Sequence, residues 1–204
     1  MESEKEILSG VEQKARVYGV PVIRTESHKI LEKIVADISP KHILEIGTAV
    51  GYSGITMLSA CSGDLVTIEH NGDLIAEAKK NFEKFGLKER VKIISGDCHI
   101  ELAKMLASGD FDEHFDFIFL DGPKAQYNLL IDGLILLLAR GGTLVADNVL
   151  FRGYVEGKTS APTKRYKTII KRLNEFIQNV KDNPKLTDFE MIDIEDGMIK
   201  VKKK

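Results

Sequence analysis

Three oxygen-bearing residues follow two short apolar segments of the chain and could together bind a metal ion. Asp121 follows residues 115–120, and Asp147 and Asn148 follow residues 143–146. Carboxylate and amide oxygens are the ligands that Mg²⁺ prefers, and two carboxylates balance its charge. Asp and Asn are also common in loops after strands, so each residue alone would mean little. Because the three gather at the ends of segments that read as neighbouring strands, they predict a magnesium site.

Lys124 lies three residues after Asp121 and is the predicted proton acceptor of this site. An ammonium group at the beginning of a helix is unfavourably placed against the helix dipole, which argues against a purely structural role. Beside a dication, the amine would be pushed toward its neutral form and could take a proton from a hydroxyl group. The alternative is a surface lysine. Tyr127, one turn later, either lines the same pocket or packs in the core.

A glycine-rich turn earlier in the chain predicts a nucleoside-binding site. Gly47, Gly51 and Gly54 follow a short apolar strand with the spacing G-x-x-x-G-x-x-G, whereas the dinucleotide fingerprint is G-x-G-x-x-G. Glu45 stands two residues before the first glycine, where a carboxylate would repel a phosphate and suits a cationic amino-acid group. The turn therefore favours a phosphate-free nucleoside over NAD, although any Rossmann-like strand-turn-helix unit is an alternative.

Glu69 ends the next apolar segment, 22 residues after Gly47. An acid at this distance from a glycine turn can hold both hydroxyls of a ribose. The alternative for Glu69 alone is a solvated acid at a strand end. Its pairing with the turn favours the ribose role, which fits a dinucleotide as well as a nucleoside.

Three motifs resemble those of one enzyme family. The patterns E-I-G-T-x-x-G-Y-S from Glu45, D-G-P-K-x-x-Y from Asp121 and D-N-V-L from Asp147 are similar to motifs of the class I S-adenosylmethionine (SAM) methyltransferases, in particular the metal-dependent O-methyltransferases similar to catechol O-methyltransferase. The resemblance covers nearly the whole chain. It implies SAM as methyl donor, Mg²⁺ or another divalent cation as cofactor, and transfer to a hydroxyl group beside a second oxygen that the metal chelates.

The resemblance also implies which residues hold each part of the site. Asp121 and Lys124 are expected to be catalytic, and Asp121, Asp147 and Asn148 are expected to bind the metal. Cys98 departs from the small polar residue that is usual in the family at its position, so its contact is less well defined. The residues expected to bind SAM are Val22 and Ser53 at the methionine end, Glu45 near the amino group, Gly47 in the turn, Glu69 at the ribose, Gly96, Asp97 and Cys98 at the adenine, and Asp121.

Strands that alternate with helices predict the fold that positions these residues. The pattern is typical of a doubly wound, mostly parallel α/β sheet. Two late segments, 189–194 and 198–201, flank the turn residues 195–197 and predict a hairpin. One late strand should therefore be antiparallel, as the resemblance also implies. We expect a Rossmann-like α/β fold with a mostly parallel, seven-stranded sheet and one antiparallel strand from this C-terminal hairpin.

Length and composition indicate a single globular domain. The 204 residues are 43% hydrophobic and 29% charged, with a net charge of −2, so the chain lacks the overall basicity of many nucleic-acid-binding proteins. We expect one SAM-dependent methyltransferase domain over residues 1–204, with N-terminal helices as a cap over 1–38 and a Rossmann-like core over 39–204. Cys61 and Cys98 do not make a disulfide framework, and no signal peptide or membrane-spanning stretch is visible, so a cytoplasmic protein is expected.

The methyl acceptor is the least determined part of the prediction. Residues 158–185 contain eight Lys and Arg against two acids, which favours a phosphate-bearing partner, although a solvated amphipathic helix is nearly as good an explanation. Arg152 follows the metal motif and is expected near the rim of the site. The resemblance is closest to bacterial members of the family that methylate 5-hydroxyuridine in tRNA, and it implies a homodimer. Other members of similar length methylate small catechols and phenols.

Two further classes of function stay open at this point. A nicotinamide-dependent Rossmann enzyme would use the same glycine turn, and a non-catalytic nucleotide-binding module would need no metal. Binding of SAM rather than NAD separates the first class from a methyltransferase, and a metal requirement separates the second.

Overall fold

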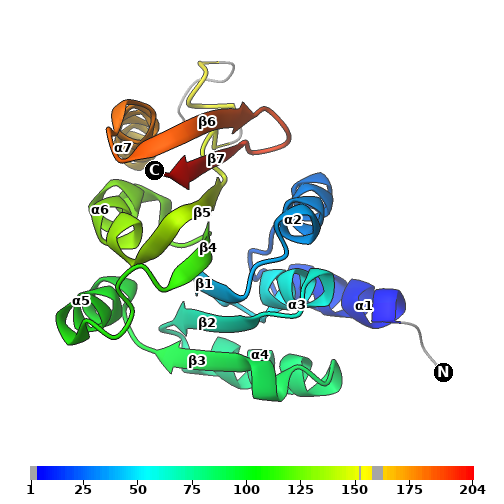
Figure 1. Cartoon of the computed structure of the whole chain (residues 1–204). Coiled ribbons are helices and arrows are strands. Elements are labelled where there is room, and N and C mark those ends of the chain that lie inside the picture. Colours follow the sequence, from blue (N-terminus) through cyan, green and yellow to red (C-terminus); the bar gives the residue numbers. More distant parts are fainter. Residues whose placement is uncertain (1–3, 152, 158–162) are drawn as a thin grey trace. The chain divides into compact units, whose positions relative to one another are not determined.

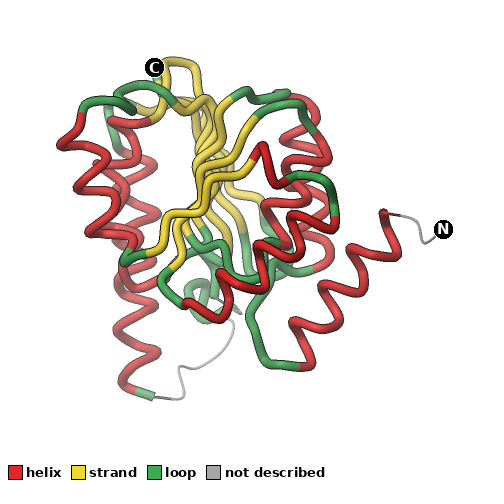
Figure 2. Tube along the Cα trace, turned by 90° about the horizontal axis from the view of Figure 1, so that it is seen from below, coloured by secondary structure: helices red, strands yellow, loops and turns green. Residues whose placement is uncertain are grey.

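The computed structural model describes residues 4–151, 153–157 and 163–204, and Figure 1 labels its helices and strands. The chain divides into two compact units, Met1–Glu101 and Leu102–Lys204. Figure 2 distinguishes the helices from the strands by colour along the whole trace. Each unit contains strands with their connecting helices, and each carries part of the predicted site.

The first unit contains three parallel strands in the order β3-β2-β1. Its central register places Leu44 beside Val66 and Thr67 beside Ile93. The strands are short and mostly apolar, as expected where helices cover both faces of a parallel sheet. The elements of this unit are α1 (Glu4–Val17), α2 (Thr25–Ile38), β1 (His42–Ile46), α3 (Tyr52–Ala60), β2 (Asp64–Glu69), α4 (Gly72–Lys84), the 3₁₀ helix η1 (Lys88–Arg90), β3 (Val91–Ser95) and the beginning of α5 (Cys98–Ser108).

Local sequence signals explain where the helices of this unit begin and end. Helix α4 begins after Asn71, whose side-chain oxygen accepts hydrogen bonds from the backbone N–H groups of Asp73 and Leu74. Helix α2 ends at Ser39, which adopts a left-handed conformation directly before Pro40.

The second unit contains four strands in the order β4-β5-β7-β6. Strands β4 and β5 are parallel, whereas β7 is antiparallel to both β5 and β6, with Leu144 beside Val201. The predicted C-terminal hairpin and its antiparallel strand are therefore confirmed. The elements of this unit are the rest of α5, β4 (Phe115–Leu120), the 3₁₀ helix η2 (Lys124–Gln126), α6 (Tyr127–Leu137), β5 (Leu138–Asp147), α7 (Lys164–Asp182), β6 (Leu186–Ile192) and β7 (Met198–Lys203).

Strand β5 is longer than the sequence predicts. The glycines Gly141 and Gly142 suggest a turn before a short strand at 143–146, but β5 already begins at Leu138. The register with β4 shifts between Phe115 and Phe117, and Gly141 has a φ of +76°. The glycines thus accommodate an irregularity inside a strand instead of a turn before it.

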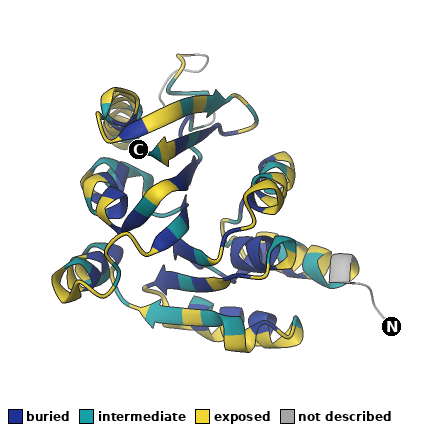
Figure 3. Cartoon of the chain, viewed as in Figure 1, coloured by how far each residue is buried: buried dark blue, intermediate teal, exposed yellow. Residues whose placement is uncertain are grey.

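Burial follows the strands in both units (Figure 3). In the first unit Ile43, Leu44 and Phe82 are almost completely buried, and in the second unit Phe117 and Phe176 are. The helices carry one buried and one exposed face, which is the pattern of helices packed on a sheet. Among the described residues, no helix combines the length and the apolar character needed to cross a membrane.

Candidate functional site

The glycine turn of the first unit joins β1 to α3 and adopts conformations that glycine favours. Gly47 and Gly51 have φ values of +103° and +84°, and Ala49 between them has +45°. The backbone N–H of Gly47 donates to the carbonyl of Ile68 at 3.0 Å, so the turn is attached to the end of β2. The turn is therefore fixed to the end of β2, and it lies at the carboxyl end of β1.

Glu69 fixes this turn, a role that the sequence does not reveal. Its Oε2 accepts the backbone N–H of Ala49 at 3.0 Å. Its Oε1 accepts the N–H groups of His70 and Asn71, each at 3.0 Å. The side chain is 7% exposed. These contacts fix the orientation of the carboxylate, and because each oxygen can accept more than one hydrogen bond, they do not conflict with the predicted ribose role.

Glu45 is completely buried and accepts hydrogen bonds from two hydroxyl groups. It accepts hydrogen bonds from Ser53 Oγ at 2.5 Å and from Thr67 Oγ1 at 2.6 Å. Because the Thr67 proton is used in this way, the 2.6 Å contact between Thr48 and Thr67 must have Thr48 as donor. Burial of a carboxylate requires such partners. The Ser53 hydroxyl proton thus points to Glu45, although the sequence predicts Ser53 as a donor to the cofactor.

The remaining glycines of the motif serve helix packing. A methyl group on Gly54 would lie 2.8 Å from Leu65 Cδ2 and 2.9 Å from Phe82 Cζ, and one on Gly51 would lie 3.0 Å from Phe82 Cζ. Helix α3 can approach β2 and α4 closely only without these side chains. The third glycine of the motif is therefore explained by packing rather than by approach of a ligand.

The residues predicted at the adenine begin helix α5. Asp97 accepts the backbone N–H groups of His99 and Ile100 at 2.9 and 3.4 Å and so caps the helix. Cys98 is buried, and burial, followed by the nearby charge of Asp97, raises the pKa of its thiol. A thiol kept protonated in this way is a poor nucleophile. Gly96 lies between β3 and this helix, and Val22 lies half-buried in the segment between α1 and α2.

The second unit brings together the four residues predicted for metal binding and proton transfer. Asp121 follows β4, and Lys124 begins η2 with its Nζ 3.8 Å from Asp121 Oδ1. Asp147 ends β5 and is 2% exposed, and its Oδ2 accepts a hydrogen bond from the side-chain amide of Asn148 at 2.8 Å. Asn148 has a φ of +61°, a conformation that asparagine tolerates better than most residues.

The two carboxylates destabilise each other's charge. Burial, and then the negative charge of Asp121, raises the pKa of Asp147 to about 8. Burial also raises the pKa of Asp121, although Lys124 and Asn148 oppose this shift. Within the described part of the chain, Asp147 Oδ1 is the buried side-chain oxygen that finds no hydrogen-bond partner. A buried acceptor without a partner beside a second acid is the environment in which a cation would be stabilising.

The donor set fits a hard divalent cation. Asp121, Asp147 and Asn148 offer only oxygen ligands, which suit Mg²⁺ better than Zn²⁺. Among the described residues, no group of three His, Cys, Asp or Glu side chains is arranged to hold a metal. A site here therefore depends on the amide of Asn148 and on non-protein ligands in addition to the two carboxylates.

Two supports of the carboxylate pair are not evident from the sequence. Tyr127 is completely buried, its hydroxyl donates to the Asp147 carbonyl at 3.1 Å, and its ring packs edge-on against Phe176. The hairpin turn also contributes, because Leu150 donates to the Asp196 carbonyl at 2.8 Å. The tyrosine thus belongs to the packing of the site, and the turn between β6 and β7 fixes the loop after β5.

Comparisons with known proteins place this geometry in a family. Residues 4–204 match the O-methyltransferase family. A catechol O-methyltransferase from Niastella koreensis is 34% identical over 70% of this chain and 65% of its own length. Catechol O-methyltransferase from Mus musculus is 30% identical over 70% of this chain and 57% of its own length. The chain thus spans less than two thirds of these relatives.

Solved structures show the same fold over almost the full chain. A proposed caffeoyl-CoA O-methyltransferase from Staphylococcus aureus has a TM-score of 0.86 at 27% identity and covers 97% of this chain and 92% of that one. The SAH-bound methyltransferase PaMTH1 from Podospora anserina has a TM-score of 0.83 at 25% identity, covering 98% and 88%. These likenesses confirm the predicted Rossmann-like α/β fold with its antiparallel C-terminal strand. The chain therefore belongs to the O-methyltransferase family, as the motifs that begin at Glu45, Asp121 and Asp147 predict.

Proposed function

We propose that the protein is an O-methyltransferase that uses SAM as methyl donor and a divalent cation, best Mg²⁺, as cofactor. The observation that carries this proposal is the pairing of half-buried Asp121 with buried Asp147, with one Asp147 oxygen lacking a partner in the described structure. The family match supports the reaction class, and the SAH-bound relative supports the methyl donor.

The residues of the second unit would hold the cation and move the proton. When bound, SAM supplies an electrophilic methyl group, and the cation orients two neighbouring acceptor oxygens and acidifies the hydroxyl. Asp121, Asp147 and Asn148 are the proposed ligands. Lys124 Nζ is the proposed acceptor of the hydroxyl proton, and its 3.8 Å contact with Asp121 keeps it beside the site. Tyr127 holds the backbone of Asp147 in place.

The residues of the first unit are proposed to hold SAM. Glu69 would bind the ribose hydroxyls in the orientation that its backbone contacts impose, and Gly96, Asp97 and Cys98 would meet the adenine. Because the Ser53 hydroxyl already donates to Glu45, we expect the methionine carboxylate to bind backbone N–H groups of the first turn of α3 instead. Val22 would cover the methionine end.

The proposed acceptor is 5-hydroxyuridine in tRNA, which offers a hydroxyl beside a carbonyl oxygen. Exposed Lys164, Arg165 and Lys167 crowd the first turn of α7, where the helix dipole adds to their attraction for phosphate. Nearby, Tyr166 forms an aromatic cluster with Phe151 and Tyr154, with ring centroids 5.2 to 5.6 Å apart. Exposed cations beside aromatic rings are typical of single-stranded RNA recognition. Arg152 and residues 158–162 of the predicted basic segment lie outside the described residues.

A small catechol is the second candidate acceptor. The catechol O-methyltransferases of Niastella koreensis and Mus musculus favour it, because they share the family and about a third of the aligned residues. A catechol presents two adjacent oxygens just as 5-hydroxyuridine does. The site chemistry therefore accepts either, and only the surroundings distinguish them.

Transfer of a labelled methyl group from SAM tests the proposal directly. Purified protein with Mg²⁺ would be given tRNA that contains unmethylated 5-hydroxyuridine and, in parallel, a simple catechol. Label in tRNA that disappears with a chelator is the expected result. Label only in the catechol would move the acceptor to small molecules, and no label in either would contradict the methyltransferase proposal.

Charge variants of α7 then test whether the helix binds tRNA. Lys164→Glu with Lys167→Glu should reduce tRNA methylation about tenfold or more while leaving catechol turnover unchanged, because phosphate contacts contribute only to the polyanion. Lys181→Glu with Lys185→Glu, at the other end of the helix, is the matched control. Equal losses of tRNA methylation in both double variants would mean that the first turn of α7 is an ordinary solvated surface and not a tRNA-binding site.

A further inference from the structure

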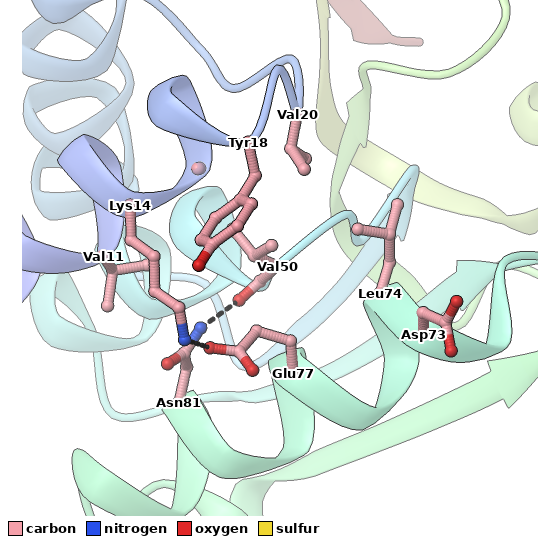
Figure 4. A pocket seen from close by; sticks show the side chains of 10 residues that line it. Val11, Lys14, Tyr18, Val20, Val50, Asp73, Leu74, Glu77 and Asn81 are labelled. Carbon is pink, nitrogen blue, oxygen red and sulfur yellow. Dashed lines mark hydrogen bonds and ion pairs between the residues drawn. The ribbon is translucent and has the colours of Figure 1, made fainter.

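A cavity in the first unit is lined by none of the residues predicted to bind SAM. Its volume is about 330 Å³, and it lies between α1, the glycine turn and α4. Figure 4 shows the side chains that line it. Of the turn, only Val50 reaches the cavity, and its side chain is 5% exposed. A volume of this size accommodates a small organic molecule.

The cavity lies between facing sides of α1 and α4, whose side chains do not fill the space between the two helices. Val11, Lys14, Ala15 and Tyr18 recur at the spacing of one helical face, and Leu74, Glu77 and Asn81 do the same on α4. The ion pair between Lys14 Nζ and Glu77 Oε1, at 2.5 Å, bridges the two faces. Tyr18 remains 75% exposed. Side chains at such spacing normally pack together, so the open space needs an explanation.

Most of the wall is apolar and suits a hydrocarbon body. Val11, Ala15 and Val50 are buried, and Val20 and Leu74 are half-buried. The Tyr18 ring stands at the rim, beside Lys14 and Val50 (Figure 4). An aromatic face at the mouth of an apolar cavity can cover a hydrophobic ligand or attract a cation.

The polar groups of the cavity carry an excess of negative charge. Asp73 and Glu77 contribute two carboxylates, against the single ammonium group of Lys14. Glu77 is paired with Lys14 at 2.5 Å and more loosely with Lys80 at 3.9 Å, whereas the exposed Asp73 carboxylate has no ion-pair partner within the described residues. Asn81 is 8% exposed, and its amide donates to the Val50 carbonyl at 2.8 Å. The balance favours a ligand with one positive charge.

We propose that this cavity binds a small organic ammonium ion whose apolar body contacts Val11, Val50 and Leu74 and whose charge faces Asp73. None of the residues proposed to hold SAM or the cation, or to move the proton, lines this cavity, and the proposal does not require the methyl-transfer reaction. Because Asn81 connects α4 to the Val50 carbonyl, a bound ligand would lie directly against the glycine turn.

Three probes of similar shape test the proposal on the whole 204-residue chain. 2-Phenylethylamine, 2-phenylethanol and phenylacetate have the same ring and nearly the same length but carry positive, zero and negative charge. Two-dimensional amide NMR titrations should show the amine shifting the signals of Ala15, Val50, Leu74 and Asn81, at least threefold more tightly than the alcohol. Tighter binding of the alcohol or of phenylacetate, or absence of binding by all three, would overturn the proposal.

The same titration with saturating SAM shows whether the site is separate. The amine should still bind, and displacement by SAM would assign the cavity to the cofactor site and overturn the proposal. This outcome differs from failure of the methyltransferase proposal, which the labelling assay reports independently.

Variants with opposite expected signs test the charge argument. Asp73→Asn should weaken amine binding about two- to fivefold, the range for one partly exposed ion pair. Lys14→Met removes the competing cation and should strengthen it. Glu83→Gln, which makes the same charge change on α4 away from the cavity, is the matched control. Ala15→Leu should fill the space and abolish binding, and amine binding unchanged in Asp73→Asn and Ala15→Leu would contradict the assignment.

Discussion

Asp147 is an acid whose surroundings disfavour its negative charge. Its side chain is 2% exposed, one oxygen lacks a hydrogen-bond partner in the described structure, and the charge of Asp121 acts against its own. A protein gains nothing in stability from such a group unless a cation compensates it. The loss of stability that Asp147 causes in the metal-free protein is thus the best support for its proposed role as a metal ligand.

Asp147→Asn should have opposite effects with and without metal. In the presence of a chelator, removal of an acid whose ionised form is disfavoured by burial and by Asp121 should raise the melting temperature by about 2–4 °C, the shift that corresponds to roughly 1 kcal/mol in a protein of this size. Added Mg²⁺ should stabilise the wild type but not the variant. Calorimetry with chelator and with Mg²⁺ measures both effects, and exposed Asp132→Asn is the control. A Mg²⁺ response that survives Asp147→Asn would contradict the metal assignment.

His28 makes stability depend on pH. It is half-buried, stacks on Tyr52 at 4.9 Å and donates from Nε2 to Thr56 Oγ1 at 2.7 Å, because the Thr56 hydroxyl itself donates to the Tyr52 carbonyl. Burial lowers its pKa below 6.5 despite nearby Glu32 and Glu12. Below pH 6.5 the unfolded chain therefore binds more protons at this residue, and the free energy of unfolding falls as the pH falls.

His28→Gln should flatten this part of the pH profile. Urea unfolding between pH 5 and 7 would give the free energy of unfolding, and its slope should be smaller in the variant than in the wild type. Above pH 7 both proteins should show little dependence from this source. An unchanged slope would mean that His28 titrates alike in the folded and unfolded states.

Helix α7 connects the basic surface to η2, which contains Lys124, the proposed proton acceptor. Arg172 Nη1 donates to the Ala125 carbonyl at 3.1 Å, one residue after Lys124. Asn179 donates to Asn128 at 3.0 Å, and Phe176 packs on Tyr127. Arg172 is therefore a structural contact of η2 and a poor choice for testing phosphate binding.

Arg172→Gln should reduce turnover through the position of Lys124. We expect kcat for a small catechol to fall about three- to tenfold, in line with the roughly 1 kcal/mol that an ordinary hydrogen bond contributes. Mg²⁺-induced stabilisation should stay unchanged, since the carboxylates are not touched. Lys171→Gln is the matched neighbour, because Lys171 is exposed and pairs only weakly with Glu175 at 3.8 Å. Equal kcat values in the two variants would sink the positioning role.

The elements that the sequence predicts well are those whose signals are local. The hairpin follows from Glu195-Asp-Gly197 between alternating runs, and the end of α2 follows from Pro40. The start of β5 is missed because a pair of glycines indicates a turn whether or not a neighbouring strand absorbs them. Only the pairing of Phe115 with Leu138 resolves this, and that pairing is not encoded near either residue.

The sequence likewise predicts only one part of the candidate site, the identity of its charged residues. Residue types at strand ends are enough to select Asp121, Asp147 and Glu69. The partners of those residues are not, because the contact of Glu69 with the Ala49 N–H and that of Tyr127 with the Asp147 carbonyl join backbone groups, which every residue has. The sequence thus identifies charged side chains but not the hydrogen bonds that orient them.

At the scale of the whole molecule, charge is distributed unevenly. The chain carries a net charge of −2, yet Lys164, Arg165 and Lys167 adjoin one another in α7. If these three contact phosphates, the logarithm of kcat/KM for tRNA should fall with the logarithm of salt concentration with a slope of roughly −2 to −3. Catechol turnover should be nearly flat over the same salt range. Steady-state kinetics at several salt concentrations measures both slopes, and parallel slopes would argue against a phosphate-binding surface.

The pairing of β5 with β7 affects the order in which the chain folds during its synthesis. Asp147 lies opposite Met198, and the loop after it is held by the turn before β7, so its surroundings need a strand that the ribosome makes much later. The strands of the first unit, by contrast, pair only over a short stretch of sequence. In nascent chains arrested before β7, the first unit should therefore resist protease. Added Mg²⁺ should not change the protease resistance of these chains. We expect the nascent chain to fold around the glycine turn first. The proposed metal site of Asp121 and Asp147 would form only after β7 has been synthesised.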